Sequence, residues 1–275
     1  MNEYRDIEKS IIKKFRKPIW SKFVRAIKDF KLIEEGDKIA VCISGGKDSM
    51  LLAKCLQELH RHGQFKFELE FISMNPGYDN ENCGMILDNA NILNIPIKSF
   101  KTDIFKVVEN HGKKTPCYLC ARMRRGHLYN KAKELGCNKI ALGHHFDDVV
   151  ETTMLNILYN GRYGTMMPIL KSDNFEDMEL IRPLYYIKES DVIAWKNYNN
   201  LNFIKCGCVV TKKKTDSKRR EVKELIKTLK EKNPNADINI FNSACNVNLN
   251  MILGYSKNNV EYNFNDFYRD NADKN

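Results

Sequence analysis

The sequence predicts an α/β protein with a doubly wound parallel sheet, N-terminal helices before it and a small helical C-terminal part after it. From residue 38 to residue 160, short apolar runs rich in β-branched residues alternate with longer segments of helical periodicity. A glycine pair follows the first run, where a strand would turn into a helix. With 275 residues, the chain is long enough to bury a core without disulfides. These observations favour strand–helix–strand units that lie in one parallel sheet.

Residues 1–35 read as an N-terminal amphipathic helical arm. Apolar residues recur every three to four positions, and Pro18 interrupts the pattern, so two helices are expected. The stripe consists of Ile11, Ile12, Phe15, Ile19, Phe23, Ile27 and Phe30. Such a stripe usually packs on a core, but it could also pair two copies of the chain, which leaves a homodimer open.

The predicted sheet lies within residues 36–204. Strands are expected at 38–43, 67–74, 96–100 and 138–142, and helices at 48–61, 80–93, 118–135 and 146–160. In parallel sheets ligands bind beyond the carboxyl ends of the strands. The ends at Ser44, Met74 and Gly143 should therefore meet in one crevice.

Beyond residue 204 the pattern loosens. Residues 205–254 are expected to form a basic helical extension that contains cysteines, with helices at 217–232 and 236–248. Residues 255–275 are polar and aperiodic, so they are expected to be a disordered tail.

The stretch from Lys38 to Leu52, KIAVCISGGKDSMLL, places small residues between a buried strand and a helix, which suits an anion site. It is not a Walker loop, because no glycine precedes Gly46 by five positions and Asp48 follows the lysine. SGGKDS instead resembles the pyrophosphate loop of the N-type ATP pyrophosphatases, which split ATP into AMP and pyrophosphate. An ordinary glycine turn before a helix is the alternative.

A second informative stretch, GHHFDDVVET, begins at Gly143. Glycine at a strand end would let a nucleotide approach the backbone closely. Asp147 and Asp148 open the next helix, where carboxylates are favoured, and they could hold the magnesium ion that accompanies ATP. Helix capping alone would also explain the two aspartates.

Two cysteine pairs could hold a metal. Cys117 and Cys120 form a C-x-x-C beside three arginines, and Cys206 and Cys208 follow 86 residues after Cys120, measured to Cys206. Four thiolates would suit a structural zinc ion, whereas three would leave an iron–sulfur cluster with one open iron. The spacing does not choose between them. A thioredoxin-like redox pair is disfavoured, because the motif does not follow a first strand.

Charge and terminal sequence indicate the partners and the compartment. The net charge is +10, with 45 Lys and Arg against 35 Asp and Glu. Seven basic and no acidic residues lie in 113–133, and eleven basic against four acidic lie in 205–232. Such segments suit nucleic acid, although solvated helix faces would look similar. The charged start, MNEYRDIEKS, is unlike a secretory signal, so a cytoplasmic protein is expected, without a membrane partner and with metal or redox cysteines.

Together, SGGKDS, PCYLCARMRRG with LYNKAKELG, KIALGHHFDDVVETTMLN and the downstream RPL closely resemble the tRNA 2-thiocytidine synthetase family. This family is the sulfur-inserting branch of the PP-loop superfamily, whose domain is of the adenine nucleotide alpha hydrolase type. The resemblance covers roughly residues 20 to 230. Lysidine synthetases look similar around SGGKDS and GHHFDD but have no use for Cys117 and Cys120. Thiouridine synthetases of the T-loop type usually carry flanking zinc fingers.

The resemblance implies a function. ATP would adenylate a pyrimidine C2 oxygen of tRNA, and sulfide would displace AMP to give 2-thiocytidine; 2-thiouridine synthesis, or a lysidine-type enzyme with structural zinc, are the alternatives. The sulfur would come from free sulfide or a cysteine desulfurase.

The resemblance also implies roles for individual residues. ATP, with Mg²⁺, would be bound by Ser44, Gly45, Gly46, Asp48, Ser49, Met74, Gly143 and Asp148. Catalysis would involve Asp48, Lys47, Arg124 and Arg125, the three cations stabilising phosphate charge. A [4Fe-4S] cluster would be bound by Cys117, Cys120 and Cys206, with Cys208 as the alternative third ligand, because this chain has C-G-C where the family has C-x-x-C.

Overall fold

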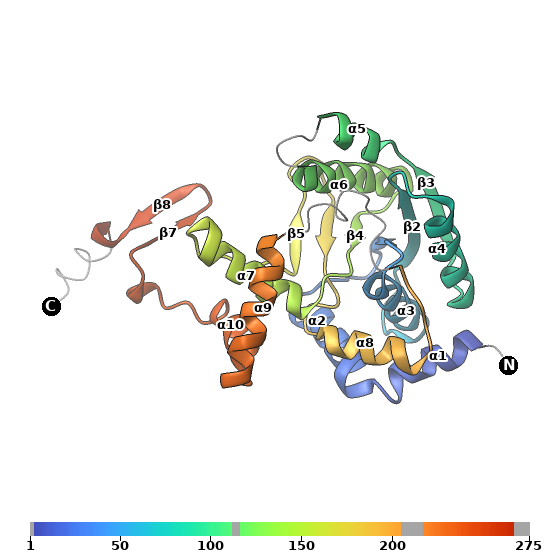
Figure 1. Ribbon diagram of the computed structural model, residues 1–275, viewed down its shortest axis with the longest axis horizontal. Coiled ribbons are helices and arrows are strands. Elements are labelled where there is room, and N and C mark those ends of the chain that lie inside the picture. Colours follow the sequence, from blue (N-terminus) through green and yellow to red (C-terminus); the bar gives the residue numbers. More distant parts are fainter. Residues whose placement is uncertain (1–2, 112–115, 205–216, 267–275) are drawn as a thin grey trace.

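The structure is a computed structural model, which describes residues 3–111, 116–204 and 217–266. A single mostly parallel sheet forms its centre, and helices cover both faces (Figure 1). The strand order is β3-β2-β1-β4-β6-β5, and every neighbouring pair is parallel except β5 and β6. The strands are β1 Lys38–Cys42, β2 Glu68–Asn75, β3 Ile97–Lys101, β4 Lys139–Ala141, β5 Ile169–Lys171 and β6 Glu179–Ile181. The predicted doubly wound sheet is confirmed, and the order reverses direction at β1, between β2 and β4.

Strand β1 shows why this sheet is covered on both sides. Successive side chains of a strand point to opposite faces. Ile39 and Val41 lie in the larger apolar cluster with helices α3 (Lys47–His62), α4 (Asn80–Ile92), α7 (Phe146–Asn160) and α8 (Glu189–Tyr198). Ala40 and Cys42 lie in a second cluster with α6 (Pro116–Glu134). The near-continuous apolar run of β1 is therefore a consequence of burial on both faces.

The N-terminal arm packs onto the face of the sheet that α3 covers. It comprises α1 (Glu3–Ile12), a π-helical segment (Arg16–Trp20) and α2 (Ser21–Asp29). Two helices are present as predicted, and Pro18 lies between them, within the π-helical segment. Ile19, Phe23 and Ile27 are buried in the core, so this stripe is not free to pair with a second copy.

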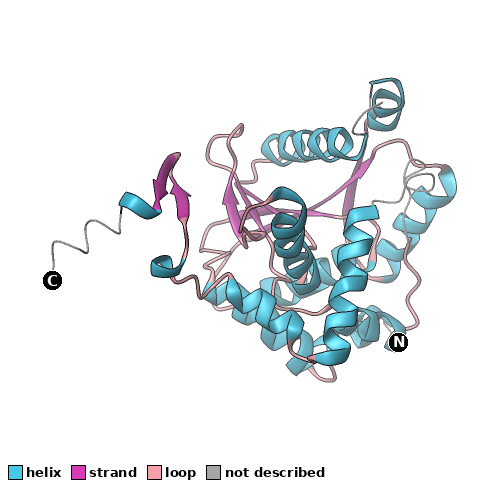
Figure 2. Cartoon of the chain, turned by 60° about the vertical axis from the view of Figure 1, so that its left-hand side comes forward, coloured by secondary structure: helices cyan, strands magenta, loops and turns pink. Residues whose placement is uncertain are grey.

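Between β3 and α6 lies α5 (Ile104–His111), an element that the strand and helix pattern did not predict. After the sheet, α9 (Ser217–Lys232) and α10 (Ala236–Ser243) pack against α7. α10 is shorter than the expected helix 236–248, since a tight turn at Ser243–Asn246 ends it. Val222 and Ile226 of α9 and Phe241 of α10 lie in the larger apolar cluster, on the face of the sheet that carries most of the helices in Figure 2.

The expectation of a disordered tail from residue 255 is wrong for residues 255–266. Strands β7 (Gly254–Lys257) and β8 (Val260–Asn263) form a hairpin that stands away from the sheet (Figure 1). Asn258 and Asn259 connect them with φ of 52° and 62°, as in the tight hairpin turns that asparagine tolerates. The rings of Tyr255 and Tyr262 stack with centroids 4.8 Å apart. Residues 267–275 lie outside the described residues.

None of the helices in the described part of the chain is both long enough and apolar enough to span a membrane.

Candidate active site

The loop Ser44–Ser49 joins β1 to α3 and is held in a fixed shape by its own serines. Ser49 Oγ accepts a hydrogen bond from the Ser44 N–H at 3.2 Å and donates one to the Gly46 carbonyl at 3.0 Å. Gly45 has φ +83°, and a Cβ there would lie 2.5 Å from Ile86 Cγ1, so both conformation and space require glycine. The loop ends at the amino terminus of α3, where free N–H groups and the helix dipole favour an anion.

Gly143 holds the loop from the neighbouring strand. It follows β4, and a Cβ at this position would lie 3.0 Å from the carbonyl carbon of Asp48 and from the backbone nitrogen of Ser49. The chain after β4 therefore touches the backbone of the first turn of α3. No larger residue fits without moving one of the two segments.

A cavity of about 550 Å³ opens at the carboxyl ends of four strands. The ends of β1, β2, β4 and β6 contribute to it, and α6 closes one side. Its lining includes Ser44, Asp48, Ser49, Met74, Arg124, Arg125, Gly143, His144, Asp148 and Arg182. Eight of the residues named from the sequence thus border one space. Gly45, Gly46 and Lys47 belong to the adjoining loop but do not line the cavity.

Two carboxylates face each other across His145 on one wall. His145 Nε2 lies 3.8 Å from Asp48 Oδ1, and its Nδ1 lies 3.5 Å from Asp148 Oδ2. Asp148 Oδ2 also accepts a hydrogen bond from the His145 N–H at 3.0 Å. Asp48 Oδ1 is buried and has no hydrogen-bond partner among the described residues. Such an oxygen suits a hard cation such as Mg²⁺.

Asp147 serves a different purpose from Asp148. Its Oδ2 accepts a hydrogen bond from the Glu189 N–H at 2.6 Å, at the start of α8. It does not line the cavity. Of the two aspartates considered for magnesium, only Asp148 lies beside the phosphate loop.

His144 is half-buried in the cavity wall and neutral at neutral pH. Burial lowers its pKa to about 4, because a charged imidazole would lose its hydration, and the negative Asp148 only partly offsets this. Its Nδ1 has no hydrogen-bond partner among the described residues. His144 can therefore offer a polar contact to a ligand without adding charge.

The cations expected to take part in catalysis differ in their position: Arg124 and Arg125 line the cavity, whereas Lys47 does not. Arg124 lines the cavity, and its Nη2 donates to the Tyr78 hydroxyl at 2.6 Å. Lys47 Nζ lies 3.1 Å from both Asp48 Oδ2 and Glu189 Oε1, so two carboxylates hold it. Burial alone would raise the pKa of Glu189, but hydrogen bonds from Lys223 and Lys47 lower it to about 2.

Helix α9 reaches the site through residues that the sequence analysis did not select. Arg219 Nη2 lies 3.2 Å from Asp148 Oδ1, and Arg219 Nε lies 2.7 Å from Glu151 Oε2. Lys223 Nζ lies 2.6 Å from Glu189 Oε2. Helix α9, which belongs to the basic segment 205–232, therefore contacts acidic residues close to the phosphate loop. Its charge was noted from the sequence, but charge alone did not single out Arg219.

The C-x-x-C positions lie on α6, the helix that closes one side of the cavity. Positions 117 and 120 lie one turn apart on this helix, Cys120 is half-buried, and the following Ala121 lines the cavity. The side chain of Cys117 and both Cys206 and Cys208 lie outside the described residues. Within the described ranges, no three His, Cys, Asp or Glu side chains are grouped to hold a metal.

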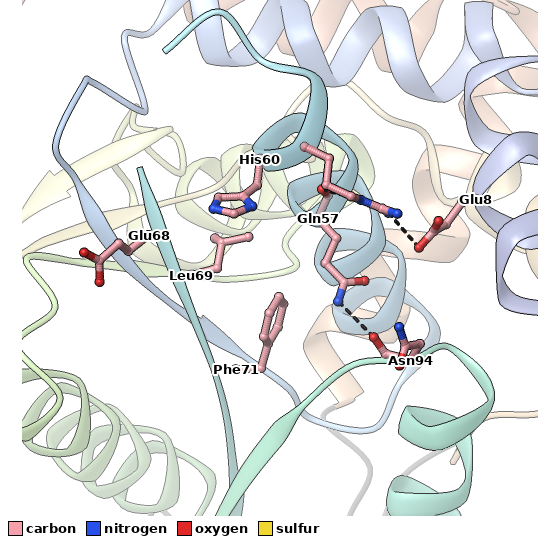
Figure 3. Close-up of a pocket in the computed structure, with 8 residues that line it drawn as sticks. Glu8, Gln57, His60, Glu68, Leu69, Phe71 and Asn94 are labelled. Carbon is pink, nitrogen blue, oxygen red and sulfur yellow. Dashed lines mark hydrogen bonds and ion pairs between the residues drawn. The ribbon is translucent and has the colours of Figure 1, made fainter. Parts of the chain in front are cut away.

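A second cavity, of about 420 Å³, lies at the amino-terminal end of β2 (Figure 3), at the opposite end of the parallel strands from the phosphate loop. Glu68 and Leu69 border it with Gln57 and His60 of α3. It has no glycine loop, and the ion pair between Arg61 and Glu8, at 2.7 Å, neutralises part of its charge. It offers no comparable anion site.

Comparisons with known proteins agree with this geometry. The PP-loop domain family matches residues 17–213. The tRNA-cytidine(32) 2-sulfurtransferase of Syntrophotalea carbinolica is 38% identical over 234 residues, 84% of this chain and 90% of that protein. The protein of the same name from Nitrosospira multiformis is 39% identical over 238 residues, 84% of this chain and 77% of that protein.

A solved structure matches the fold. The U34-tRNA thiolase NcsA from Methanococcus maripaludis, with its [4Fe-4S] cluster, aligns with a TM-score of 0.66 and 24% identity, over 82% of this chain and 76% of that chain. Sequence and fold lead to the same conclusion. The chain belongs to the PP-loop family and, within it, to the group of the tRNA-cytidine(32) 2-sulfurtransferases.

Proposed function

We propose that this protein uses ATP to replace the C2 oxygen of a tRNA cytidine with sulfur, giving 2-thiocytidine. One observation carries the proposal: a single cavity is bordered by the phosphate loop Ser44–Ser49 and by α6, the helix that contains Cys117 and Cys120. The site that activates an oxygen would then lie beside the residues that deliver sulfur. The curated relatives, which are named as tRNA sulfurtransferases, support this reading.

ATP would bind with its phosphates at the amino terminus of α3. Ser44, Gly45, Gly46 and Ser49 would present the loop backbone and hydroxyls, and Gly143 would keep that backbone in place. Met74, at the end of β2, would contact the adenine. Asp48 and Asp148 would hold Mg²⁺, which would offset the negative charge of the phosphates. The unpartnered Asp48 Oδ1 supports this role.

The reaction would take place in two displacements. First, a bond forms between the cytidine C2 oxygen and the α-phosphorus while the bond to pyrophosphate breaks. Next, sulfide forms a bond to C2, the C2–O bond breaks, and AMP leaves with the oxygen. Arg124 and Arg125 line the cavity and would stabilise the growing phosphate charge, and Lys47, in the adjoining loop, would contribute to this as well.

The sulfur side of the site would be formed by cysteines. A [4Fe-4S] cluster bound by Cys117, Cys120 and either Cys206 or Cys208 would supply an iron position for sulfide. The i, i+3 spacing of positions 117 and 120 on α6 fits two ligands of one group. Free sulfide or a cysteine desulfurase would provide the sulfur atom.

Transfer RNA would be the partner of the basic surface. Exposed Arg122 and Arg125 on α6 and the basic helix α9 flank the cavity, and positive side chains attract the phosphate backbone. The target base must leave its stack and enter the cavity before its C2 atom can react. A neighbouring cavity of about 600 Å³ shares Met74 and includes Tyr78 and Phe100 in its lining, so two adjoining spaces are available for ATP and a base.

The test is the nucleoside content of tRNA from cells that lack this protein. We expect mass spectrometry to show loss of 2-thiocytidine, restored by the wild-type gene and by Cys245→Ser but not by Cys120→Ser. Cys245 is an exposed cysteine that does not line the cavity and serves as the matched control. Loss of 2-thiouridine instead would show that the protein carries out the same sulfur insertion on a tRNA uridine rather than on a cytidine. Unchanged thionucleosides would refute the proposed function.

A further inference from the structure

Arg182 is a buried arginine at the carboxyl end of β6. It is 8% exposed and lines the same cavity as Ser44, Asp48 and Ser49. In the sequence, Arg182 belongs to the RPL motif, to which no role was assigned. The rule that ligands meet the carboxyl ends of parallel strands would have selected this residue.

The guanidinium of Arg182 does not use all of its hydrogen-bond donors. Its Nη1 donates one hydrogen bond to the Met167 carbonyl. Its Nε is buried and has no hydrogen-bond partner among the described residues. Within the same residues, no carboxylate oxygen lies within 4.0 Å of it. Tyr129 and Tyr185 are close but neutral at neutral pH, since burial raises the pKa of each hydroxyl.

The other buried cations of the described residues are paired. Lys54 has Glu8 as its partner, and Lys139 Nζ lies 2.8 Å from Asp37 Oδ2. Arg182 is the exception in this part of the chain. A buried charge without a counter-ion is costly, so proteins keep one chiefly where a ligand supplies the opposite charge.

Arg182 nevertheless remains charged. Burial, and to a smaller extent the neighbouring Arg125, lower its pKa to about 10, which is still well above neutrality. Together with Arg124 and Arg125 it makes part of the cavity lining positive, while Asp48 and Asp148 make another part negative. Such a division suits a ligand that is itself anionic and carries a metal ion.

We propose that Arg182 binds the phosphate chain of a nucleoside polyphosphate, whose negative charge is the counter-ion missing from the free protein. This assignment rests on the proposed function, in which ATP occupies the cavity. An RNA backbone phosphate is the other source of such charge. With only 8% of its surface exposed, Arg182 lies too deep for an RNA backbone that must stay outside the cavity, whereas the phosphate loop lines the same cavity.

The experiment compares two arginines, one unpaired and one paired. Thermal unfolding of Arg182→Met and Arg61→Met is measured with and without inorganic pyrophosphate and ATP. Arg61 is the matched control, because it already has Glu8 as its partner at the second cavity. We expect Arg182→Met to keep or raise the midpoint without ligand and to weaken pyrophosphate binding at least tenfold. Arg61→Met should lower the midpoint and keep the ligand-induced shift.

Other outcomes would overturn the assignment. If Arg182→Met lowers the midpoint as much as Arg61→Met does and keeps the pyrophosphate shift, Arg182 only supports the Met167 segment. Absence of any shift in the wild type would contradict the assignment as well. If Arg182→Met fails to fold, Arg182→Lys replaces it: a point charge should retain part of the pyrophosphate affinity while losing the planar fork.

Two further measurements separate the possible failures. Filter binding of tRNA should be unchanged by Arg182→Met; if tRNA affinity falls and pyrophosphate affinity does not, RNA phosphate is the occupant and the assignment is wrong. The nucleoside analysis tests the proposed function independently. Pyrophosphate binding through Arg182 in a protein on which no thionucleoside depends would leave the Arg182 assignment standing and remove the proposed function.

Discussion

Gly143 packs directly on the backbone of Ser49, at 3.0 Å from the Ser49 nitrogen to the position that a Cβ would take. This contact sets the distance between the end of β4 and the amino terminus of α3. The phosphate loop is therefore shaped by a neighbouring strand as well as by its own glycines and serines.

Gly143→Ala should weaken ATP binding about tenfold, roughly 1.4 kcal/mol, because the new methyl group pushes the first turn of α3 away from its position. Overpacking should cost only about 1–3 kcal/mol of stability, so the protein still folds. Gly84→Ala is the control, since a Cβ at Gly84 in α4 meets nothing within 4 Å. Calorimetric titration with ATP checks both variants. Equal affinity in Gly143→Ala and wild type would show that the contact does not shape the site.

Arg219→Ala should loosen α9 from the site. Arg219 contacts Asp148 and Glu151 of α7, and its removal leaves both carboxylates without that cation. Because Arg219 is partly exposed, we expect a loss of only about 1 kcal/mol in unfolding free energy. Hydrogen exchange should become faster in α9 more than elsewhere. The adjacent, exposed Arg220→Ala is the control; similar exchange in both variants would contradict a specific role for Arg219.

His144 should make stability depend on pH between 6.5 and 4. Its pKa is about 4 in the folded protein and 6.5 in the reference state, so the unfolded chain binds the proton more readily in this range. The stabilising contribution is fully present above pH 6.5 and is lost as pH falls toward 4. His144→Gln should show a shallower fall of the unfolding midpoint over this window. Parallel curves for the two proteins would exclude His144 as the cause.

Much of the fold could be predicted because local pattern and tertiary environment agree. β1 reads as a buried strand, and it is buried on both faces between α3 and α6. Gly45 could be recognised in the sequence because its positive φ favours glycine, and a glycine between a strand and a helix is visible as such. The hairpin β7–β8 was missed because its apolar residues are few, although Asn258-Asn259 carries the turn signal.

Long-range partners could not be predicted in the same way. Nothing in the local sequence of Glu189 indicates that it holds both Lys47 and Lys223, because those contacts join three segments far apart in the chain. The missing counter-ion of Arg182 is likewise visible only when the surrounding side chains are placed. Motifs identify residues whose own backbone is constrained, while charge pairing depends on the complete fold.

The ion pair between Glu8 and Lys54 provides the sharpest stability test, because it anchors the N-terminal arm to α3 at a fully buried lysine. Lys54 also donates to the Leu93 carbonyl at 2.7 Å, and Arg61 shares Glu8 at 2.7 Å. Glu8→Gln would leave the buried ammonium without a charged partner, a change that typically costs about 3–5 kcal/mol. Urea unfolding should show this loss.

Two comparisons separate the buried pair from a general effect of charge on α1. Asp6→Asn removes another carboxylate of this helix, one that faces exposed Lys9 at 3.7 Å, and should change stability little. Lys54→Met added to Glu8→Gln should recover part of the lost stability, since the uncompensated charge is then gone. If the double variant is less stable than Glu8→Gln alone, the lysine contributes through its hydrogen bonds to Gln57 and Leu93 rather than through its charge.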